Sequence, residues 1–445
     1  MAPADPKAAT LLHALQAEGG LASSPQLQAR LGWSQASVSR ALAPWVREGV
    51  VRKVGAARSQ RYLLPRALHG LGASSPVHRI DEQGVPHRFG ELTALPGGRF
   101  WMDEVDGTAR VHDGLPWFLS DMRPQGFMGR AFARHHPELG LPTDPRQWTD
   151  DEVLRALALA GEDLPGNLIV GEAAFQRYAQ ALLPTAVPTQ VHDADQTDEL
   201  ARAAAESLQG QWAGSSAGGE QPKFCALSQG LPVIVKFSAA GDGPAEQRSR
   251  DLLVCEHLAL RNLADAGVAT APSRLAWAAG RVFLISQRFD RTRRGRIGMV
   301  SLMAFDAEHI GHMDHWAATA QRLRSRELIS AADAETLCLL DAYGLLIANT
   351  DRHYGNISWL RQDGAWRLSP GYDMLPMFYA AVNGEVVARD LAALPLHPVA
   401  ATLAVWPQAL ALALRFWQQA ARADELSEDF RRIAAANVAT LQALG

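Results

Sequence analysis

The sequence predicts an α+β protein made of a small basic head, a strand-rich middle part and a body that ends in helices. Three observations indicate this fold class: apolar residues recur at helical spacing near the N-terminus, short strands follow, and the stretch from about residue 400 is helical and rich in Ala and Leu. The chain has 445 residues, and domains of roughly 100 to 200 residues each are usual. We therefore expect several domains.

The composition is that of an ordinary globular protein, with 47% apolar and 20% charged residues. The N-terminal segment lacks the layout of a secretory signal, and no run of about 18 apolar residues is present. These features predict a cytoplasmic location and no contact with a membrane. Cys225, Cys255 and Cys338 lie far apart without a CxxC motif. They are predicted to be small buried residues in a reducing compartment rather than zinc ligands.

The charges are distributed unevenly along the chain. Residues 1–66 contain nine Lys or Arg against three Asp or Glu residues, whereas the whole chain has a net charge of -4. The head is therefore basic and the remainder acidic. This asymmetry predicts that only the head contacts nucleic acid.

The head begins with an expected helix over residues 7–18, which the segment GGLAS then breaks. Ser24 is predicted to cap a second helix, with Pro25 in its first turn. That helix should end at Gly32, where a left-handed conformation suits glycine. The first two helices are therefore short and close together.

A third helix is expected to start after Ser34 and to run until Gly49, with one apolar face made by Val38, Leu42, Trp45 and Val46. The segments VVRKVG (50–55) and QRYLL (60–64) then read as two short strands around AARS. Two helices joined by a turn and followed by such a hairpin are typical of a winged helix-turn-helix domain. This predicts such a domain at residues 1–68.

This arrangement resembles that of winged-helix regulators, in which the third helix enters the major groove of DNA. The resemblance implies two groups of DNA-binding residues. The residues available to bases or phosphates are Gln35, Ser37, Ser39 and Arg40. The residues that reach the DNA backbone are Arg52, Lys53, Arg58 and Arg61. The alternative is a winged helix that contacts protein, with its basic residues only solvated. Winged-helix heads often dimerise, so a homodimer is also compatible with the sequence.

A linker rich in small residues (69–76) should separate the head from a second part at residues 77–195. That part is expected to begin with strands in the stretches 87–96, 98–105 and 109–115 and to continue with helices and the segment DLPGNLIVG (163–171). It contains no recognisable chemical constellation. Every feature that looks catalytic lies after residue 196.

The segment SSAGGEQPK (215–223) precedes a strand-like stretch. Its glycines, Gly218 and Gly219, would let the backbone approach an anion, and its successive N–H groups could cradle phosphate oxygens. The segment does not match the Walker A motif, and a Gly-Gly turn between two strands is the alternative.

A single lysine, Lys236, lies within the apolar strand 231–237. A cation among Val and Ile side chains must be neutralised, and nucleotide phosphates would do so. In the small lobe of a kinase such a lysine also pairs with a glutamate of a helix, for which Glu256 is the first candidate and Glu246 the second. The alternative is a lysine on an edge strand with a solvated head.

The segment NTDRHYGN places Asn356 five positions after Asp351, which is the spacing of the kinase catalytic loop. There the aspartate orients the attacking hydroxyl and accepts its proton, and the asparagine binds magnesium. Asp373, in the turn after the strand AWRLS, matches the second acidic residue that holds magnesium against the phosphates. Together these residues predict a magnesium-nucleotide site.

The ordered motifs SSAGGEQPK, VIVKFS, SQRFDR, NTDRHYGN and SPGYDM resemble those of HipA family serine/threonine kinases, and DLPGNLIVG loosely matches the family's N-terminal subdomain. The resemblance implies a two-lobed, protein-kinase-like (HipA-like) fold with a small lobe at residues 196–290 and a mainly helical large lobe at residues 291–445. The winged helix does not belong to the usual HipA layout.

Carried over by position, the resemblance makes Asp351 the catalytic base, with the remaining roles as follows: Asn356 and Asp373 as magnesium ligands, Lys236 and Lys223 at the nucleotide, Gln287 to Phe289 as the adenine-contacting hinge, and Ser216 as the autophosphorylated residue of the glycine loop. Ser215 is the neighbouring alternative to Ser216. His353 could orient phosphate or form a hydrogen bond within the loop. The basic run Arg288, Arg291, Arg293, Arg294 and Arg296 is predicted to be a solvated loop, with binding of an acidic protein substrate or a phosphate as the alternative.

The predicted function is an ATP- and Mg²⁺-dependent serine/threonine kinase that inhibits growth. Its implied partners are DNA, at the head, and a protein substrate such as a translation factor or an aminoacyl-tRNA synthetase. Two alternatives remain open: a transcription regulator whose kinase-like body senses a ligand without turnover, and a small-molecule phosphotransferase.

Overall fold

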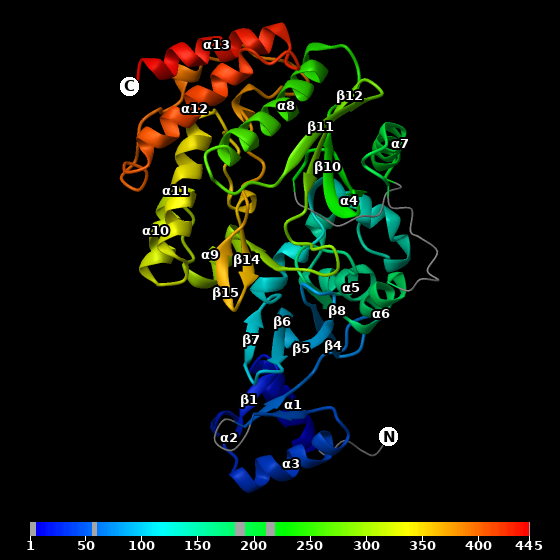
Figure 1. Cartoon of the computed structure of the whole chain (residues 1–445). Helices are drawn as coiled ribbons and strands as arrows, with labels where there is room; N and C mark the ends of the chain where they lie inside the picture. Colours follow the sequence, from blue (N-terminus) through cyan, green and yellow to red (C-terminus); the bar gives the residue numbers. More distant parts are fainter. Residues whose placement is uncertain (1–5, 56–59, 183–191, 211–218, 445) are drawn as a thin grey trace.

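The computed structural model describes residues 6–55, 60–182, 192–210 and 219–444. The chain runs from an N-terminal head through a middle sheet to a large body that carries the C-terminus at the opposite end of the molecule (Figure 1). Arg58, Ser215, Ser216 and Gly218 lie outside the described residues. No helix within the described part is long and apolar enough to cross a membrane.

The head consists of three helices and a three-stranded antiparallel sheet of order β1-β3-β2: α1 (Pro6–Ala17), α2 (Ser24–Leu31), α3 (Gln35–Arg47), β1 (Leu21–Ser23), β2 (Arg52–Val54) and β3 (Arg61–Leu63). The predicted apolar face of α3 packs into the core of the head. The Ser34 side chain caps α3 by accepting a hydrogen bond from the Ser37 backbone, as predicted. Gly32 ends α2 with a φ of 66°, also as predicted.

One local prediction for the head was wrong. Ser23, not Ser24, caps α2, because its side chain accepts a hydrogen bond from the Gln26 backbone while the Gln26 side chain accepts one from the Ser23 backbone. The first helix ends before GGLAS, as predicted, and this segment also contains β1, which pairs with β3. This pairing joins residues about 40 positions apart, so local sequence patterns do not reveal it.

The middle part is built on a five-stranded antiparallel sheet of order β7-β6-β5-β4-β8, with three helices: β4 (Ser74–Ile80), β5 (Pro86–Leu95), β6 (Arg99–Glu104), β7 (Ala109–Asp113), β8 (Leu168–Val170), α4 (Gly126–His135), α5 (Asp150–Ala160) and α6 (Glu172–Ala181). Since β4 begins at Ser74, the linker is shorter than the predicted 69–76. Apolar residues of the sheet and of α5 form a common core, which includes Phe100 and Leu157.

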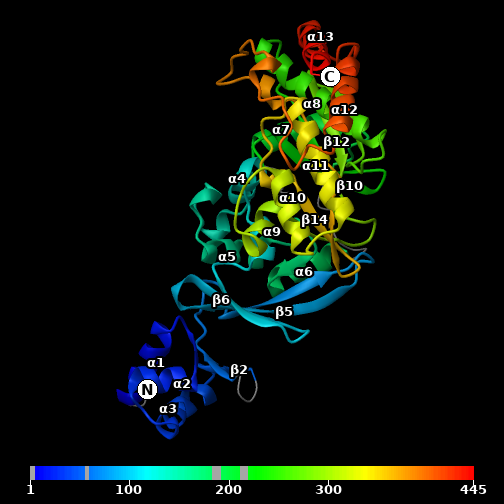
Figure 2. The ribbon, with the colours of Figure 1, turned by 90° about the vertical axis from the view of Figure 1, so that its left-hand side faces the viewer.

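The head packs directly against the middle sheet, as both views show (Figures 1 and 2). Leu21 and Leu63 of the head form an apolar cluster with Leu95 and Trp101 of the sheet. Arg66 adds two hydrogen bonds to the Asp151 carboxylate, of 2.6 and 2.8 Å. The connection between head and middle part is therefore a packed interface.

The small lobe contains a four-stranded antiparallel sheet of order β11-β12-β10-β9. One helix precedes the sheet in the chain, and a long helix connects its second and third strands: α7 (Thr197–Leu208), β9 (Lys223–Ser228), β10 (Leu231–Phe237), α8 (Pro244–Ala264), β11 (Ser273–Ala278) and β12 (Arg281–Gln287). Apolar residues of α7 and of the sheet share one core. Strand β10 is an inner strand, so the alternative of Lys236 as an edge-strand lysine is wrong.

The large lobe combines five helices with a three-stranded sheet of order β13-β14-β15: β13 (Gly298–Ser301), α9 (Leu302–His309), α10 (Trp316–Ser325), α11 (Ala331–Leu346), β14 (Ser358–Gln362), β15 (Ala365–Leu368), α12 (Trp406–Ala420) and α13 (Glu428–Gln442). Short 3-10 helices connect several elements: Pro96–Gly98, Trp117–Met122, Pro137–Leu139, Pro145–Gln147, Tyr354–Asn356, Met377–Tyr379 and Leu391–Ala393.

The core of the large lobe extends into α8 of the small lobe and contains fully buried aromatic side chains such as Trp316, Tyr343 and Trp417. Cys255 and Cys338 are buried, as predicted, whereas Cys225 is only partly buried. Because α8 belongs to this core, the Glu256 side chain on it has a fixed position relative to the large lobe.

Candidate active site

A cavity of about 500 Å³ lies where the small lobe, the large lobe and the middle part meet. Ten of the candidate residues that the sequence singled out line it: Gly219, Lys223, Lys236, Glu256, Gln287, Arg288, Phe289, His353, Asn356 and Asp373. These residues come from both lobes and from segments more than 100 positions apart. The fold therefore gathers the predicted nucleotide and metal residues around one space.

Lys236 occupies the centre of an ion-pair network beside this cavity. Its Nζ lies 2.7 and 2.9 Å from the two carboxylate oxygens of Glu256 and also contacts Asp373. The Lys236 side chain is 13% exposed and the Glu256 side chain 2% exposed. Burial would lower the pKa of Lys236, but Asp373 and Glu256 outweigh it and raise the pKa. The pairing explains how an inner strand tolerates a cation, and the second candidate, Glu246, is not needed.

Lys223 lies beside Lys236 on the same face of the sheet, because the two residues are direct cross-strand partners of β9 and β10. Burial, together with the Lys236 charge, lowers the pKa of Lys223 to about 8. Gly219 is adjacent, since a Cβ built on it would lie 3.0 Å from the Lys223 Nζ. The described end of the glycine segment thus lies beside the buried amino group of Lys223.

The loop after α11 connects the two acidic candidates. Asn349 is fully buried, and its side chain accepts a hydrogen bond from the Asp351 backbone (3.0 Å) and donates one to the Asp373 backbone oxygen (3.3 Å). The Asn356 side chain donates to the Asp351 backbone oxygen at 2.8 Å. These bonds fix the loop that carries Asp351 against the turn that carries Asp373.

Asp351 itself is exposed and is not among the described residues that line the cavity. Partial burial raises the pKa of its carboxyl, His353 opposes this effect, and the negative charge of Asp373 adds to it. Asp373 has a φ of 57°, which is rare for a residue other than glycine. Burial would raise the pKa of Asp373, but Lys236 and Lys223 outweigh it and hold that pKa below its usual value.

His353 makes the loop hydrogen bond that was one of its two predicted roles. Its Nδ1 accepts from the Gly355 backbone at 3.0 Å and caps the short helix Tyr354–Asn356. The ring also lines the cavity, so a role at a phosphate remains compatible with its position. Sequence reasoning missed a supporting pair, in which Arg352 Nε donates to the Asp341 carboxylate of α11 at 3.1 Å.

The prediction of a solvated basic loop after β12 was wrong for three of its five arginines. Arg288, Arg291 and Arg296 are 5, 9 and 5% exposed, whereas Arg293 and Arg294 are exposed. The buried arginines pair with two carboxylates, Asp290 and Asp163. Asp163 belongs to the middle part, and no sequence pattern indicates that it reaches this segment.

The middle part also lines the cavity, which the sequence did not indicate. Ser120, Asp121, Gln125 and Pro165 contribute to its wall. Both oxygens of Asp121 accept hydrogen bonds from Ser301, one from the backbone at 2.5 Å and one from the hydroxyl at 2.7 Å. Of these residues, only Pro165 lies in a stretch that had attracted attention, DLPGNLIVG.

Helix α4 of the middle part holds the described end of the glycine segment. The Phe127 backbone donates to the Gly219 backbone oxygen at 3.1 Å, and Arg130 makes two hydrogen bonds to the Glu220 carboxylate, of 3.1 and 2.6 Å. Gly126 is needed there, since a Cβ on it would lie 2.3 Å from the Gly219 oxygen. The middle part therefore fixes the position of Gly219.

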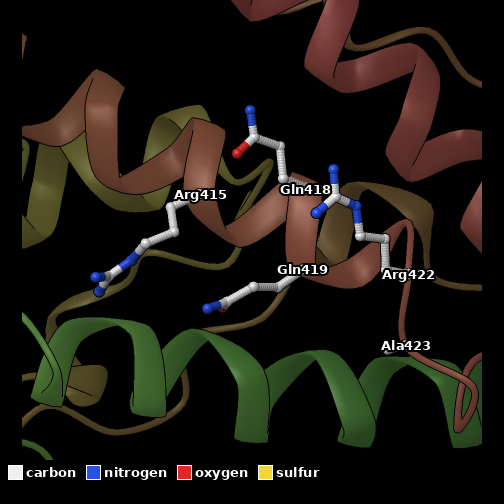
Figure 3. Close-up of a pocket in the computed structure, with 5 residues that line it drawn as sticks. All are labelled: Arg415, Gln418, Gln419, Arg422 and Ala423. Carbon is white, nitrogen blue, oxygen red and sulfur yellow. The ribbon is translucent and has the colours of Figure 1, made fainter.

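A second hollow of about 410 Å³ lies on α12 and is lined by Arg415, Gln418, Gln419, Arg422 and Ala423 (Figure 3). Its side chains do not converge, since Gln418 points upward and Gln419 points to the left in this view (Figure 3). Arg415 is already bonded to Asn262. None of the residues singled out by the sequence lies there, so the cavity between the lobes is the candidate site.

The predicted DNA-binding residues of the head have different environments. Gln35, Ser39 and Arg40 are exposed on α3, and Lys53 and Arg61 are exposed on the hairpin strands. Ser37 is half-buried, and its hydroxyl lies 3.1 Å from that of Ser34. Arg52 turns toward the middle sheet, where it donates to Ser74 (2.8 Å) and to Glu91 (3.0 Å). Those two contacts place Arg52 in the interface between head and body.

Comparison with known proteins assigns both larger parts of the chain. Residues 215–442 match the family described as HipA-like C-terminal domain, and residues 71–179 match the family described as YjjJ-like toxin, middle domain. The Escherichia coli (strain K12) protein named Toxin YjjJ is 37% identical over 423 residues, which cover 93% of this chain and 94% of that protein.

A chain of the Shewanella oneidensis MR-1 toxin–antitoxin complex of HipA, HipB and operator DNA has a similar fold. It matches with a TM-score of 0.50 and 17% identity, over 82% of this chain and 96% of that one. The fold class is thus that of HipA, with mixed helices and sheets and a mainly helical C-terminal lobe. The sequence matches and the fold together show that the chain belongs to the HipA-like toxin family.

Proposed function

We propose that this HipA-type toxin is an ATP- and Mg²⁺-dependent serine/threonine protein kinase that carries a DNA-binding head. One observation supports the enzymatic part above all others. Lys236, Glu256, Asn356 and Asp373, which come from separate elements of both lobes, line the same cavity of about 500 Å³. A pocket of this size accommodates a small-molecule ligand or cofactor.

The lysines suit the phosphates of a nucleotide. Lys236 and Lys223 present two amino groups on one face of the sheet, beside Gly219. Phosphate oxygens would neutralise both groups and replace part of the pairing that Lys236 makes with Asp373. Gln287 and Phe289, which also line the cavity, would contact the base. The Phe289 ring lies 5.3 Å from that of Tyr372, which leaves an apolar surface for a planar ligand.

The residues present also fit magnesium. Asp373 and Asn356 offer oxygen atoms, which Mg²⁺ prefers, and both line the cavity. Within the described residues, no group of three or more His, Cys, Asp or Glu side chains forms a dedicated metal site. A magnesium ion held by one or two side chains and the phosphates of its nucleotide needs no such group. When bound, the ion would neutralise charge on the phosphates.

Asp351 would orient the attacking hydroxyl and accept its proton. Its carboxylate is exposed, so an acceptor chain can reach it, and its backbone is fixed by Asn349 and Asn356. Partial desolvation by the surrounding residues and the Asp373 charge raise the pKa of Asp351, which increases its basicity. The hydroxyl would come from serine or threonine, as the family resemblance implies.

Control and targets of the kinase are part of the proposal. Phosphorylation of Ser216, or of its neighbour Ser215, would add a charge of about -1.5 to -2 beside the nucleotide phosphates and silence the enzyme. The head would bind DNA through α3 and its hairpin, and the Shewanella relative is itself part of a complex with operator DNA. A translation factor or an aminoacyl-tRNA synthetase is the proposed class of substrate.

Incubation of the purified chain with labelled ATP and Mg²⁺ tests the proposal, with Asp351→Ala as the comparison. We expect the wild type to label itself at Ser216 and the variant to remain unlabelled. Absence of labelling in both would favour a regulator with an inactive kinase-like body, and labelling of a metabolite in a cell extract would favour a small-molecule phosphotransferase.

A further inference from the structure

Two sequence segments without an assigned role, DLPGNLIVG and the arginine run after β12, lie against each other. Arg291 donates to the backbone oxygens of Gly166 (2.8 Å) and Leu164 (2.7 Å) and to the carboxylate of Asp163 (2.8 Å). In the other direction, the Gly166 backbone donates to the Asp290 carboxylate at 3.0 Å. The loop 163–167 of the middle part is therefore fastened to the segment that leaves the small lobe.

The charges of this contact form one cluster, which we call the clasp: Asp163, Arg288, Asp290, Arg291 and Arg296. Four of its side chains are buried, with exposures of 4 to 6%, whereas Asp163 is 50% exposed. Three guanidinium groups thus share two carboxylates. Burial, together with the neighbouring Arg291, lowers the pKa of Arg296 to about 9.

Asp163 is the carboxylate that reduces the excess of positive charge in the clasp. Asp290 is committed to Arg288 and Arg291, at 2.9 and 2.7 Å. Asp163 lies 2.8 Å from Arg291, 3.7 Å from Arg288 and 3.9 Å from Arg296. Without it, Asp290 alone would face three positive charges, and buried charges are costly unless they are paired.

The clasp also forms part of the cavity wall. Arg288, Asp290 and Pro165 line the cavity next to Gln287 and Phe289, which are proposed to contact the base. Pro165 stands between two residues, Leu164 and Gly166, whose backbone groups are bonded to Arg291 and Asp290. Any shift of the clasp would consequently move both this wall and the hinge.

We propose that Asp163 is a positioning residue for the nucleotide: through the clasp it holds the middle part against the hinge and so sets the shape of the base-binding wall. The inference rests on the proposed nucleotide site. It assigns a role in nucleotide affinity to a residue outside the kinase lobes that does not itself touch the cavity.

The test uses the full-length chain and ADP with Mg²⁺ as the probe. Asp163→Asn keeps the shape of the side chain and removes its charge. We expect the dissociation constant for ADP, measured by calorimetry, to rise about tenfold, as for other substitutions that act through a contact network. The rate of ATP turnover at saturating ATP should change less than about twofold, because Asp351 and Asp373 are untouched. Asp163→Glu should restore most of the affinity.

Two further variants keep the test decisive. Arg294→Gln removes one unit of charge, of opposite sign, from the arginine run that Asp163 contacts, but its side chain is exposed and outside the clasp, so its ADP affinity should equal that of the wild type. Should Asp163→Asn not fold, Arg291→Lys keeps the charge, but its three N–H donors cannot replace the five hydrogen bonds that Arg291 makes. It is expected to weaken ADP binding in the same direction.

The two proposals fail in different ways. If the wild type binds no ADP, the nucleotide site is wrong and the role of Asp163 falls with it. If the wild type binds ADP and both Asp163→Asn and Arg291→Lys bind it equally well, only the role of the clasp is overturned. A change in the rate of ATP turnover at saturating ATP, with the affinity for ADP unchanged, would likewise overturn the role of the clasp.

Discussion

The cavity between the lobes and the N-terminal head are both rich in basic residues, but they hold them differently. In the cavity, Lys236 is 13% exposed and bound by Glu256 and Asp373. In the head, Arg40 and Lys53 are exposed at the surface. A buried cation requires partners that the fold must supply, whereas an exposed cation requires only water.

Because of this difference, the charges of the cavity indicate its function more specifically than the charges of the head do. The partners of Lys236 are themselves acidic residues at the positions expected for a kinase, so the cavity supports a specific chemistry. The exposed basic residues of the head are compatible with DNA binding and equally with solvation. Measurements on matched substitutions in the two regions therefore test whether buried and exposed basic residues differ as expected.

The largest difference is expected for the free energy of unfolding. Lys236→Met leaves Glu256 buried without its partner and should lower this free energy by about 3–5 kcal/mol. The same substitution at exposed Lys53 should change it by less than about 0.5 kcal/mol. Urea unfolding of both variants measures the effect. In the double variant Lys236→Met/Glu256→Met part of the loss should return, and equal stabilities of the two single variants would contradict the comparison.

A smaller effect is expected for DNA binding by the head. Arg40→Ala should weaken binding to duplex DNA from upstream of the gene by about 1–3 kcal/mol, the usual range for an arginine that contacts a base. Fluorescence polarisation measures it. Arg30→Ala is the matched control on α2, because the Arg30 side chain is paired with Glu18 at 2.6 Å. If both variants bind as the wild type does, the head is not a DNA-binding domain of the proposed kind.

The third expected effect is a pH dependence within the cavity. Burial and the Lys236 charge lower the pKa of Lys223 to about 8, and only its protonated form attracts phosphate. Raising the pH from about 7 to about 9 should therefore weaken ADP binding by about tenfold. Lys223→Arg keeps its charge across this range and should flatten the profile. A profile unchanged by this substitution would assign the titration to another group.

The smallest effect is expected at the contact between α4 and the glycine segment. Arg130 and Glu220 are partly exposed, with side-chain exposures of 34 and 69%, and their distance is 2.6 Å. Such pairs contribute about 0.2–1 kcal/mol, so Arg130→Glu or Glu220→Arg should raise the dissociation constant for ADP by about two- to fivefold. The double reversal should restore binding. No rescue would mean that the pair does not position Gly219.

Features that depend only on neighbouring residues could be predicted from the amino-acid sequence. Ser34 and Gly32 mark helix ends because capping needs only one or two nearby side chains. The apolar spacing of α3 and the strand around Lys236 follow from periodicity, and the interval between Asp351 and Asn356 reflects a single short loop. The ordered motifs also sufficed to indicate the family to which the chain belongs.

Only the tertiary structure shows which charged side chains lie close together and which of them are buried. Arg291 and Asp163 are 128 positions apart, and nothing local distinguishes these buried arginines from the exposed Arg293 and Arg294. The wall formed by Asp121 and Gln125, and the contact of Arg52 with Glu91, likewise depend on domain packing. Burial and pairing are properties of distant segments brought together, so local sequence patterns do not contain them.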